Sequence, residues 1–452
     1  MKELLHEAAR RAQLYVSSVN RRRVSPASDS VARLEKLAEP LPDQPTDPRE
    51  VLALLDDYGS PATVASTGGR YFGFVTGGTV PASLAASWLA AAWDQNCAFR
   101  VMSPVLSRLE EIASDWLRDL FGLPALSGCG FVTGATMANF AGLSAARHAL
   151  LARAGWNVEE QGLFGAPEIK VVVGAEVHIS LLKALSLVGF GKARVTTVPA
   201  DDQGRMRADL LPVLDECTVV CMQAGNVNSG AFDPAVEICA RAHEAGAWVH
   251  VDGAFGLWAA VAPERRHLVA GVSEADSLAT DCHKWLNVPY DCGLTFVRDA
   301  VHLRNAMTFN AAYLQATAAR EPSHFTPEAS RRARGVEVWA ALRSLGRSGL
   351  AEMIERNCRQ AACFAEGLRA AGFAILNDVV LNQVLVSFGT DAQTQRVIEE
   401  VQKDGTCWCG GTQWQGQTAM RISVSCWATS DEDVRQSLEA IVRIARSVLS
   451  SH

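Results

Sequence analysis

The stretch AWVHVDGAFGLW, residues 247–258, ends an apolar run with a single carboxylate, Asp252, and continues into small residues. A lone carboxylate at the end of a core strand is costly unless a positive group or a hydrogen-bond donor faces it. Further along, TDCHKW, residues 280–285, supplies an amine in similarly apolar surroundings, Lys284. Two interpretations stay open at this point: an ion pair between Asp252 and Lys284, or a third group that meets both side chains.

Short apolar runs alternate with helical patterns from residue 66 onward. The runs are GFVTG, IKVVVG, ARVTTV, CTVVCMQAG, AWVHVDG, DSLATD and LTFVRD. Runs of this kind predict strands that are buried on both faces of a mainly parallel sheet. In such sheets ligands bind beyond the carboxyl ends of the strands, which is where small and polar residues gather in this sequence. We therefore expect an α/β fold.

The domain pattern predicts three parts. Residues 1–65 are helical and then proline-rich, which indicates an arm; residues 66–345 form a large domain; and residues 346–452 mix helices with strands in a smaller α+β domain. The first helix carries charges throughout, so it does not resemble a signal peptide. Residues 71–93 carry no charge, but a Gly-Gly pair and Pro81 divide them into a loop and a helix too short to span a bilayer, so we expect buried core there.

Composition narrows the class of protein. The 452 residues are 48% hydrophobic, enough for one large core and a smaller one, and the net charge of -7 is interspersed. The only basic run, residues 21–23, predicts a solvated helix end, so no nucleic-acid partner is expected. Twelve cysteines without a paired C-x-x-C pattern favour reduced thiols over a disulfide framework or a zinc site. We expect a cytoplasmic enzyme with no metal and no membrane partner.

Four features at predicted strand ends share one explanation. GFVTGATMANF, residues 130–140, is a strand, a turn and a helix start near Thr136 that would face an anion, although such turns also merely permit packing. His178 follows another strand, where a lone histidine more often has a structural role. An anion site, an aromatic ring, the acid Asp252 and the amine Lys284 together match the phosphate, ring face, pyridine nitrogen and aldehyde carbon of pyridoxal phosphate.

The sequence resembles the group II pyridoxal-phosphate-dependent amino-acid decarboxylases, the family of aromatic-amino-acid, glutamate and tyrosine decarboxylases. The likeness rests on HVDGAFGLW and TDCHKWLNVPYDCG, and extends to RYFGFVTGG, TGATMANFAGLSAAR, AGNVNSGAFDP, SRRARGVEVWAALRSLGRSGL and MRISVSCWATSDEDV. It implies the aspartate-aminotransferase-like fold, fold type I. It also implies a homodimer with active sites at the subunit interface, pyridoxal 5'-phosphate as cofactor and an amino acid as substrate.

The resemblance also implies residue roles. Lys284 would bind the aldehyde carbon of the cofactor, Asp252 would pair with the pyridine nitrogen, Ala254 would lie against the ring and His178 would stack on its other face. The positions that match phosphate contacts are Ala135, Thr136 and His283, and Asn228 falls near the polar edge of the cofactor. The positions that match substrate contacts are Phe74, Thr76 and Arg421, whose planar guanidinium suits a carboxylate.

The activity implied is decarboxylation of an L-amino acid to an amine and carbon dioxide. Many relatives carry a loop tyrosine that protonates Cα, but residues 314–330, LQATAAREPSHFTPEAS, contain none. Alternatives are therefore an oxidative deaminase or aldehyde synthase, or a carbon–carbon lyase or aldolase; a non-catalytic protein that keeps the fold is a third class. We expect His324 to donate the proton or to control what reaches the carbanion, because histidine titrates near neutral pH. The alternative is that His324 is an exposed loop histidine with no role. His178 and Tyr313 are competing donors.

The substrate side chain is less well defined. Phe72, Phe74 and Trp93 favour an apolar or aromatic substrate if they line the pocket, and they carry no such information if they are core residues.

Overall fold

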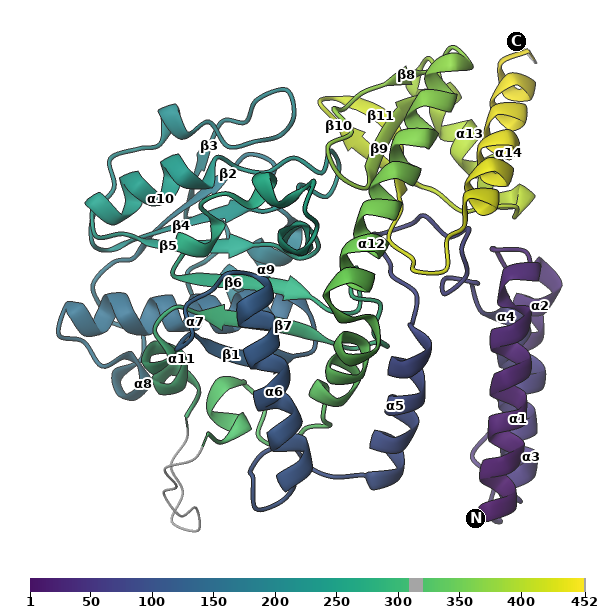
Figure 1. Cartoon of the computed structure of the whole chain (residues 1–452), viewed down its shortest axis with the longest axis horizontal. Helices are drawn as coiled ribbons and strands as arrows, with labels where there is room; N and C mark the ends of the chain where they lie inside the picture. The colour runs from purple at the N-terminus through teal and green to yellow at the C-terminus, as the bar shows by residue number, and fades with distance from the viewer. Residues whose placement is uncertain (309–319, 451–452) are drawn as a thin grey trace. The chain divides into compact units, whose positions relative to one another are not determined.

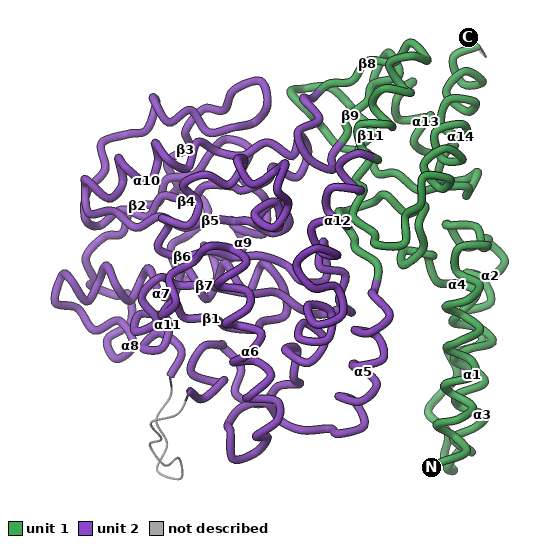
Figure 2. Tube along the Cα trace, viewed as in Figure 1, with its two compact units in different colours: residues 1–78, 360–376, 384–452 green, residues 79–359, 377–383 purple. Residues whose placement is uncertain are grey.

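The computed structural model describes residues 1–308 and 320–450. They form two compact units, one of residues 1–78, 360–376 and 384–452, and the other of residues 79–359 and 377–383 (Figure 2). These limits differ from the expected ones at 65 and 345, and the N-terminal segment shares a unit with the C-terminal residues. The division into an arm and two domains stays a prediction about how the chain folds.

A seven-stranded sheet is the framework of the unit that holds residues 79–359 (Figure 1). Its order is β1-β7-β6-β5-β4-β2-β3, and every described neighbour pair is parallel except those of β7 with β1 and β6. The strands are β1 Gly128–Val132, β2 Lys170–Gly174, β3 Val195–Val198, β4 Thr218–Gln223, β5 Trp248–Asp252, β6 Ser277–Asp281 and β7 Gly293–Val297. All seven predicted runs form strands, and the mainly parallel sheet confirms the α/β prediction.

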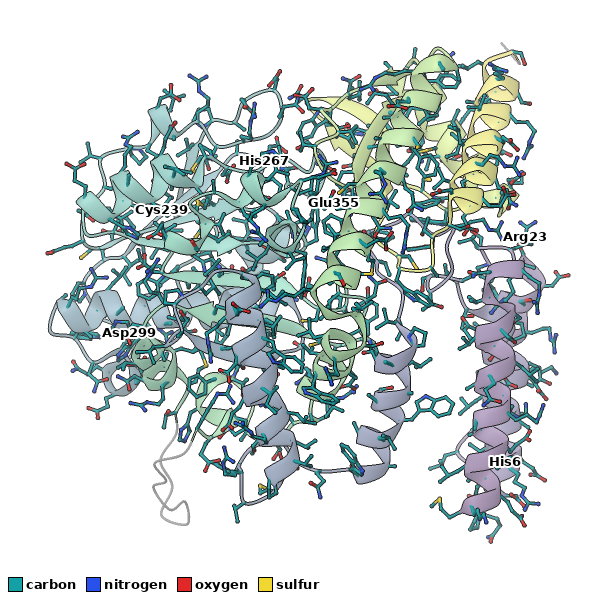
Figure 3. All side chains as sticks on the ribbon, viewed as in Figure 1. His6, Arg23, Cys239, His267, Asp299 and Glu355 are labelled. Carbon is teal, nitrogen blue, oxygen red and sulfur yellow. The ribbon has the colours of Figure 1, made fainter. Side chains whose placement is uncertain are left out.

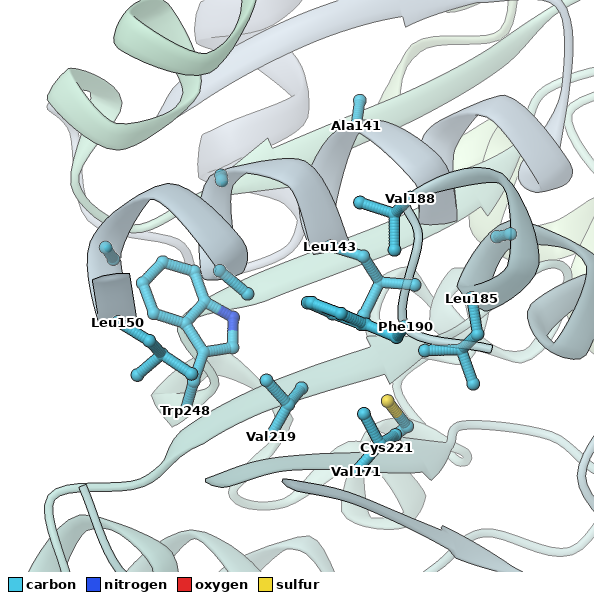
Figure 4. Close-up of a cluster of buried hydrophobic side chains, with 14 of the residues drawn as sticks. Ala141, Leu143, Leu150, Val171, Leu185, Val188, Phe190, Val219, Cys221 and Trp248 are labelled. Carbon is cyan, nitrogen blue, oxygen red and sulfur yellow. The ribbon is translucent and has the colours of Figure 1, made fainter. Parts of the chain in front are cut away.

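Helices α7, α10 and α11 pack on this sheet. The helices that begin in this unit are α5 Pro81–Trp93, α6 Pro104–Leu120, α7 Ala135–Arg153, α8 Val158–Gln161, α9 Ile179–Leu187, α10 Ala235–Glu244, α11 Ala300–Met307 and α12 Gly335–Ala370. α7 packs against β5, β6, β7 and α9. Figure 4 shows the resulting core, in which Leu143 and Leu150 of α7 and Leu185 of α9 meet Val219 and Trp248 of the sheet. Burial on this scale stabilises the layer that carries the strand ends.

The other unit combines N-terminal helices with a second sheet of order β10-β11-β9-β8. Its elements are α1 Lys2–Ser18, α2 Ser28–Ala32, α3 Pro48–Leu54, α4 Ser60–Ala62, β8 Ala374–Ile375, β9 Gln383–Ser387, α13 Asp391–Asp404, β10 Gly410–Trp414, β11 Gln417–Ser423 and α14 Asp431–Ser450. Arg23, labelled in Figure 3, donates to the carbonyl of Lys403 at 2.6 Å, and Arg70 donates to the carbonyl of Thr406 at 2.6 Å. These bonds join the N-terminal segment to the C-terminal α+β part.

The expectation of buried core for residues 71–93 is wrong for the helix. α5 begins at Pro81 as expected, because proline suits the first helical position. Of its residues, which are all described, only Ser83 is buried, and Trp88 and Leu89 are 44% and 56% exposed. An apolar sequence shows that a helix avoids water, but it does not show which chain provides the cover. No helix in the described part of the chain is long and apolar enough to cross a membrane.

A buried ion pair ties α6 to the segment before α12. Arg331 donates from both terminal nitrogens to Glu110, at 2.8 and 3.0 Å, and the two side chains are only 2% and 0% exposed. Two parallel hydrogen bonds between a guanidinium and a carboxylate satisfy most of the groups that burial removes from water. Removal of either partner would break both bonds and leave the other charge poorly compensated in the core.

We predict that Arg331→Met lowers the free energy of unfolding by about 3–5 kcal/mol, because the buried Glu110 loses both hydrogen bonds from Arg331 and keeps only Arg320, 3.8 Å away, as a cation. Urea unfolding followed by tryptophan fluorescence measures the change. Arg207→Met is the matched control: Arg207 makes a similar two-bond pair with Asp209, at 2.8 and 2.7 Å, but on the surface of the same unit. Equal effects of the two substitutions would contradict the prediction.

Candidate active site

The carboxyl edge of the sheet gathers most of the predicted residues. Asp252 is the last residue of β5, Asp281 is the last residue of β6, and Lys284 follows three residues later. α7 begins at Ala135, directly after β1, and His178 caps α9 after β2. Because β2, β5 and β6 run in the same direction, these positions meet at one edge of the sheet.

Asp252 is a buried carboxylate that two N–H groups face. Asn139 Nδ2 donates to Oδ2 at 3.1 Å, and the backbone N–H of Ala254 donates to Oδ1 at 3.2 Å. The residue is only 5% exposed, and no ion pair to it occurs among the described residues. The simple ion pair between Asp252 and Lys284 is therefore not what the structure shows. Asp252 remains an anionic acceptor for which a cationic partner would be favourable.

Lys284 pairs with a nearer carboxylate instead. Its Nζ lies 2.8 Å from Asp281 Oδ2, and the other oxygen of Asp281 accepts from the backbone N–H of Ala135 at 2.6 Å. Burial disfavours the charged amine, but Asp281, with further contributions from Asp252 and Tyr290, outweighs burial, so the pKa of Lys284 lies above its ordinary value. Asp281 thus holds the amine and also occupies an anion position at the N-terminus of α7.

His283 lies beside this pair. Its ring stacks on Tyr290 with the centroids 4.4 Å apart, and its Nδ1 accepts from the backbone N–H of Cys292 at 3.2 Å. Burial lowers the pKa of His283 although Asp281 opposes the shift, and Nε2 of His283 lies 3.6 Å from Asp281 Oδ1. The imidazole is therefore expected to be neutral at neutral pH, with Nε2 directed at the Asp281 side of the α7 N-terminus.

The remaining predicted residues of this unit have defined local settings. Nδ1 of His178 accepts from the Ser180 N–H at 3.2 Å, so this ring is oriented by its own helix. Asn228 is buried, and its backbone N–H donates to Asn226 Oδ1 at 2.8 Å in the loop after β4. Thr136 is half-buried in the first turn of α7, which has no side-chain cap.

Phe74, Thr76 and Arg421 belong to the other unit. Phe74 and Val75 both have φ near +55°, at 53° and 56°, and such values are strained for an aromatic and a β-branched residue. Phe74 is 65% exposed and stacks on Trp408 with centroids 5.4 Å apart. Strained backbone that presents an exposed aromatic ring is typical of ligand-contact segments.

The other residues of that unit complete the comparison with the sequence. Thr76 donates its N–H to the carbonyl of Gly73 at 3.1 Å, and Arg421 lies half-buried on β11, opposite Gly410 of β10. Phe72, by contrast, is 1% exposed and packs edge-on against Phe364, so it is a core residue.

The structure of a single chain does not bring His324 to Lys284. His324 lies in the short helix Pro322–Phe325 and lines a cavity with Gly128 and Cys129, at the start of β1. Ala135 and the Lys284 cluster lie beyond the opposite end of that strand. Tyr313, the other predicted donor, falls outside the described residues. The role of His324 as proton donor stays a prediction.

Comparison with known proteins explains why these groups occur together. The family described as the pyridoxal-dependent decarboxylase conserved domain matches residues 36–390. The chain belongs to this decarboxylase family. Tryptophan decarboxylase 1 of Oryza sativa subsp. japonica is 27% identical over 422 residues, which cover 84% of this chain and 81% of that relative.

Two solved structures show the same fold. The crystal structure of Oryza sativa TDC with PLP and tryptamine has a TM-score of 0.90 at 24% identity, covering 99% of this chain and 97% of that chain. Rhodiola rosea 4-hydroxyphenylacetaldehyde synthase has a TM-score of 0.84 at 21% identity, covering 99% and 98%. The predicted family and fold type I are thus confirmed. The decarboxylase is a carboxy-lyase whose cofactor is pyridoxal 5'-phosphate.

The residues of the decarboxylase fit this cofactor. Asp252 offers a buried anion for a protonated ring nitrogen, and Lys284 offers an amine for the aldehyde. The N-terminus of α7 already attracts one anionic group, Asp281, so a phosphate suits the same place. Gly134 keeps this corner open, because a Cβ there would lie 3.1 Å from the ring of His283.

Sequence reasoning missed three residues of this site. Asp281 stands inside the motif TDCHKW, but only its neighbours were assigned roles. His250 precedes Asp252 by two residues, so strand alternation places both side chains on one face of β5. Asn139, one turn into α7, is a fully buried polar residue in an apolar helix. The available signal was in each case a polar residue in an apolar setting.

We predict that Lys284→Ala abolishes the covalent attachment of pyridoxal phosphate, since the amine at this edge is lost. Borohydride reduction followed by mass spectrometry of peptides measures the attachment. Lys183→Ala is the control, because Lys183 lies on α9 near His178 and should keep a modified peptide that contains Lys284. A reducible adduct that persists in Lys284→Ala at another lysine would contradict the assignment.

Proposed function

We propose that this protein removes carbon dioxide from an L-amino acid and releases the corresponding amine, with Asp252 and Lys284 as its central residues. The observation that carries the proposal is the buried Asp252 carboxylate, faced by Asn139 and Ala254, at the same sheet edge as the amine of Lys284. An acid and an amine held apart there match the two ends of one cofactor.

When bound, pyridoxal phosphate supplies the electron sink for the pair of electrons left at Cα. Asp252 would keep the ring nitrogen protonated, which makes that sink effective, and Lys284 would hold the aldehyde carbon. The first turn of α7, with Ala135 and Thr136, binds the phosphate, and His283 lies beside it.

Other residues of the chain have proposed roles toward the ring and the substrate. Ala254 and His178 lie against the two faces of the ring, and Asn228 contacts its polar edge. Arg421 binds the substrate carboxylate, while Phe74 and Thr76 line its side-chain pocket. The strained and exposed position of Phe74 supports an apolar or aromatic substrate side chain.

A second function is proposed for the same cofactor site: conversion of the amino acid to an aldehyde with release of ammonia. Two observations favour it over other side reactions. Residues 314–330 contain no tyrosine to protonate Cα, and one protein of the same fold is named as a 4-hydroxyphenylacetaldehyde synthase. A carbanion that receives no proton reacts with oxygen instead, and yields peroxide along with the aldehyde and ammonia.

We also propose that the protein works as a homodimer. Exposed apolar side chains support this state. They occur on and after α5, and include Trp88, Leu89, Trp93, Val101 and Met102. A second copy is the proposed cover for this surface. A cytoplasmic location is proposed as well, supported by twelve free thiols, of which ten are buried.

We predict that the purified protein loaded with pyridoxal phosphate releases carbon dioxide from one or a few of the twenty common L-amino acids, with aromatic ones preferred. Carbon dioxide, amine, aldehyde, ammonia and peroxide are measured together for each. Equal amounts of amine and carbon dioxide establish the decarboxylase. Aldehyde, ammonia and oxygen uptake in step with carbon dioxide establish the second function. Release of none of these products from any amino acid would overturn both.

We predict that His324→Phe lowers amine formation by about 10²-fold, the usual contribution of a general acid, and raises aldehyde and peroxide. Because His324 lies away from Lys284 in its own chain, it would have to act on another copy. Mixed dimers of His324→Phe and Lys284→Ala chains would then regain the parent product ratio, because one site combines Lys284 with His324. A parent-like ratio in the single variant would exclude His324 as donor.

A further inference from the structure

A continuous chain of hydrogen bonds leads from the core to Asp252. Trp248 Nε1 donates to Ser277 Oγ at 2.8 Å, and Ser277 Oγ lies 2.8 Å from Nδ1 of His250. Nε2 of His250 lies 2.9 Å from Asn139 Oδ1, and Asn139 Nδ2 donates to Asp252 Oδ2 at 3.1 Å. Every member is at most 5% exposed, so water does not compete for these bonds.

The first and last members of this series of hydrogen bonds, Trp248 and Asp252, determine where each proton lies. Indole N–H can only donate, and an ionised carboxylate can only accept. Asn139 must therefore turn its amide N–H to Asp252 and its oxygen to His250, which must carry a proton on Nε2. Nδ1 of His250 is then bare and accepts the hydroxyl proton of Ser277, whose oxygen accepts from Trp248. All the bonds are thus polarised in one direction, toward Asp252.

Three elements build this arrangement together. Trp248, His250 and Asp252 alternate along β5 and share one face, and Ser277 of β6 pairs with His250 in the sheet register. α7 crosses this face and supplies Asn139. Gly142, one turn further along α7, leaves the space for the imidazole, since a Cβ there would lie 2.8 Å from His250 Cε1.

Two features distinguish this series of hydrogen bonds from ordinary core packing. A glycine inside a helix is unfavourable relative to alanine, and here the space that the imidazole ring of His250 needs accounts for it. Burial lowers the pKa of His250 to about 3, so the ring is neutral at working pH. A neutral imidazole with one N–H and one bare nitrogen can accept a hydrogen bond at Nδ1 and donate another at Nε2.

We propose that Trp248, Ser277, His250 and Asn139 are positioning residues that hold Asp252 as an oriented anion for the ring nitrogen of pyridoxal phosphate. The proposal rests on the proposed function, in which Asp252 meets that nitrogen. Hydrogen bonds to an ionised carboxylate favour its charged form and restrict its rotation. Each donor in a chain also strengthens the next, so Asn139 donates more strongly than an isolated amide.

The test compares the affinities of the full-length chain, stripped of cofactor, for two probes. One is pyridoxal phosphate, and the other is its 1-deaza analogue, in which C–H replaces the ring nitrogen. The ratio of the two affinities measures the contribution of the bond between Asp252 and the ring nitrogen. The contributions of the phosphate and the aldehyde cancel, because both probes carry these groups. We expect Asn139→Leu to lower the preference for pyridoxal phosphate about tenfold, the usual effect of one hydrogen bond to a charged group. Ser277→Ala should lower it about threefold, because its effect passes through His250.

Two further variants make the outcome decisive. Ser144→Ala is the matched control: Ser144 is a buried serine of α7 that donates to the carbonyl of Phe140 at 2.7 Å, outside the chain of bonds, and its ratio should equal the parent's. Asp252→Ala should remove the preference. If Asp252→Ala keeps it, Asp252 does not meet the ring nitrogen, and the proposed function fails with the proposal.

If Asp252→Ala removes the preference for pyridoxal phosphate but Asn139→Leu and Ser277→Ala both behave like Ser144→Ala, the positioning proposal alone is overturned. Near-ultraviolet circular dichroism and thermal unfolding of the stripped chain show that each variant is folded. Ser277→Ala removes one hydroxyl and changes no charge. It therefore tests the proposal if Asn139→Leu is too unstable to measure.

Discussion

Burial of the Asp252 carboxylate at the end of β5 is the constraint on which the rest of the site depends. A charge removed from water must be met by donors or by an opposite charge. Here Asn139 and the backbone of Ala254 donate, and no cation pairs with Asp252 among the described residues. α7 must therefore lie where Asn139 reaches the strand end. A cofactor with a protonated ring nitrogen supplies the missing opposite charge, so its binding should also stabilise this unit.

The second carboxylate at the same edge has a different task. Asp281 lies three residues before Lys284 and holds its amine while it accepts the N–H of Ala135. The two carboxylates thus have different partners: Asp281 pairs with the amine, and Asp252 is proposed to meet the ring nitrogen. A phosphate at the N-terminus of α7 would meet the same donor as Asp281, so cofactor binding and the position of Lys284 are coupled through one helix end.

The residues proposed to choose the substrate and the product come from other segments of the chain. Phe74 and Arg421 belong to the unit of residues 1–78, 360–376 and 384–452, and His324 lies at the far end of β1 from Lys284. The cofactor site can therefore stay the same while these other segments change. The solved structures with this fold carry different names: one is a TDC and another is a 4-hydroxyphenylacetaldehyde synthase.

The sequence by itself determined the seven strands and their mainly parallel arrangement, because buried parallel strands read as apolar runs. It also singled out Asp252 and Lys284 as candidate site residues, because a carboxylate or an amine at the end of an apolar run is conspicuous. Family motifs added the cofactor and the roles proposed for His178, Ala135 and His283. Only the tertiary structure decided that Lys284 pairs with Asp281 and not with Asp252.

The same holds for the exposure of α5 and for the bonds from Trp248 to Asp252. An apolar helix has the same composition whether its own chain or another covers it. The hydrogen-bonded chain joins α7, β5 and β6 across more than one hundred residues, since Asn139 and His250 meet only when the helix packs on the sheet. Such contacts depend on packing distances between elements, and these are a property of the folded core and not of any local run of residues.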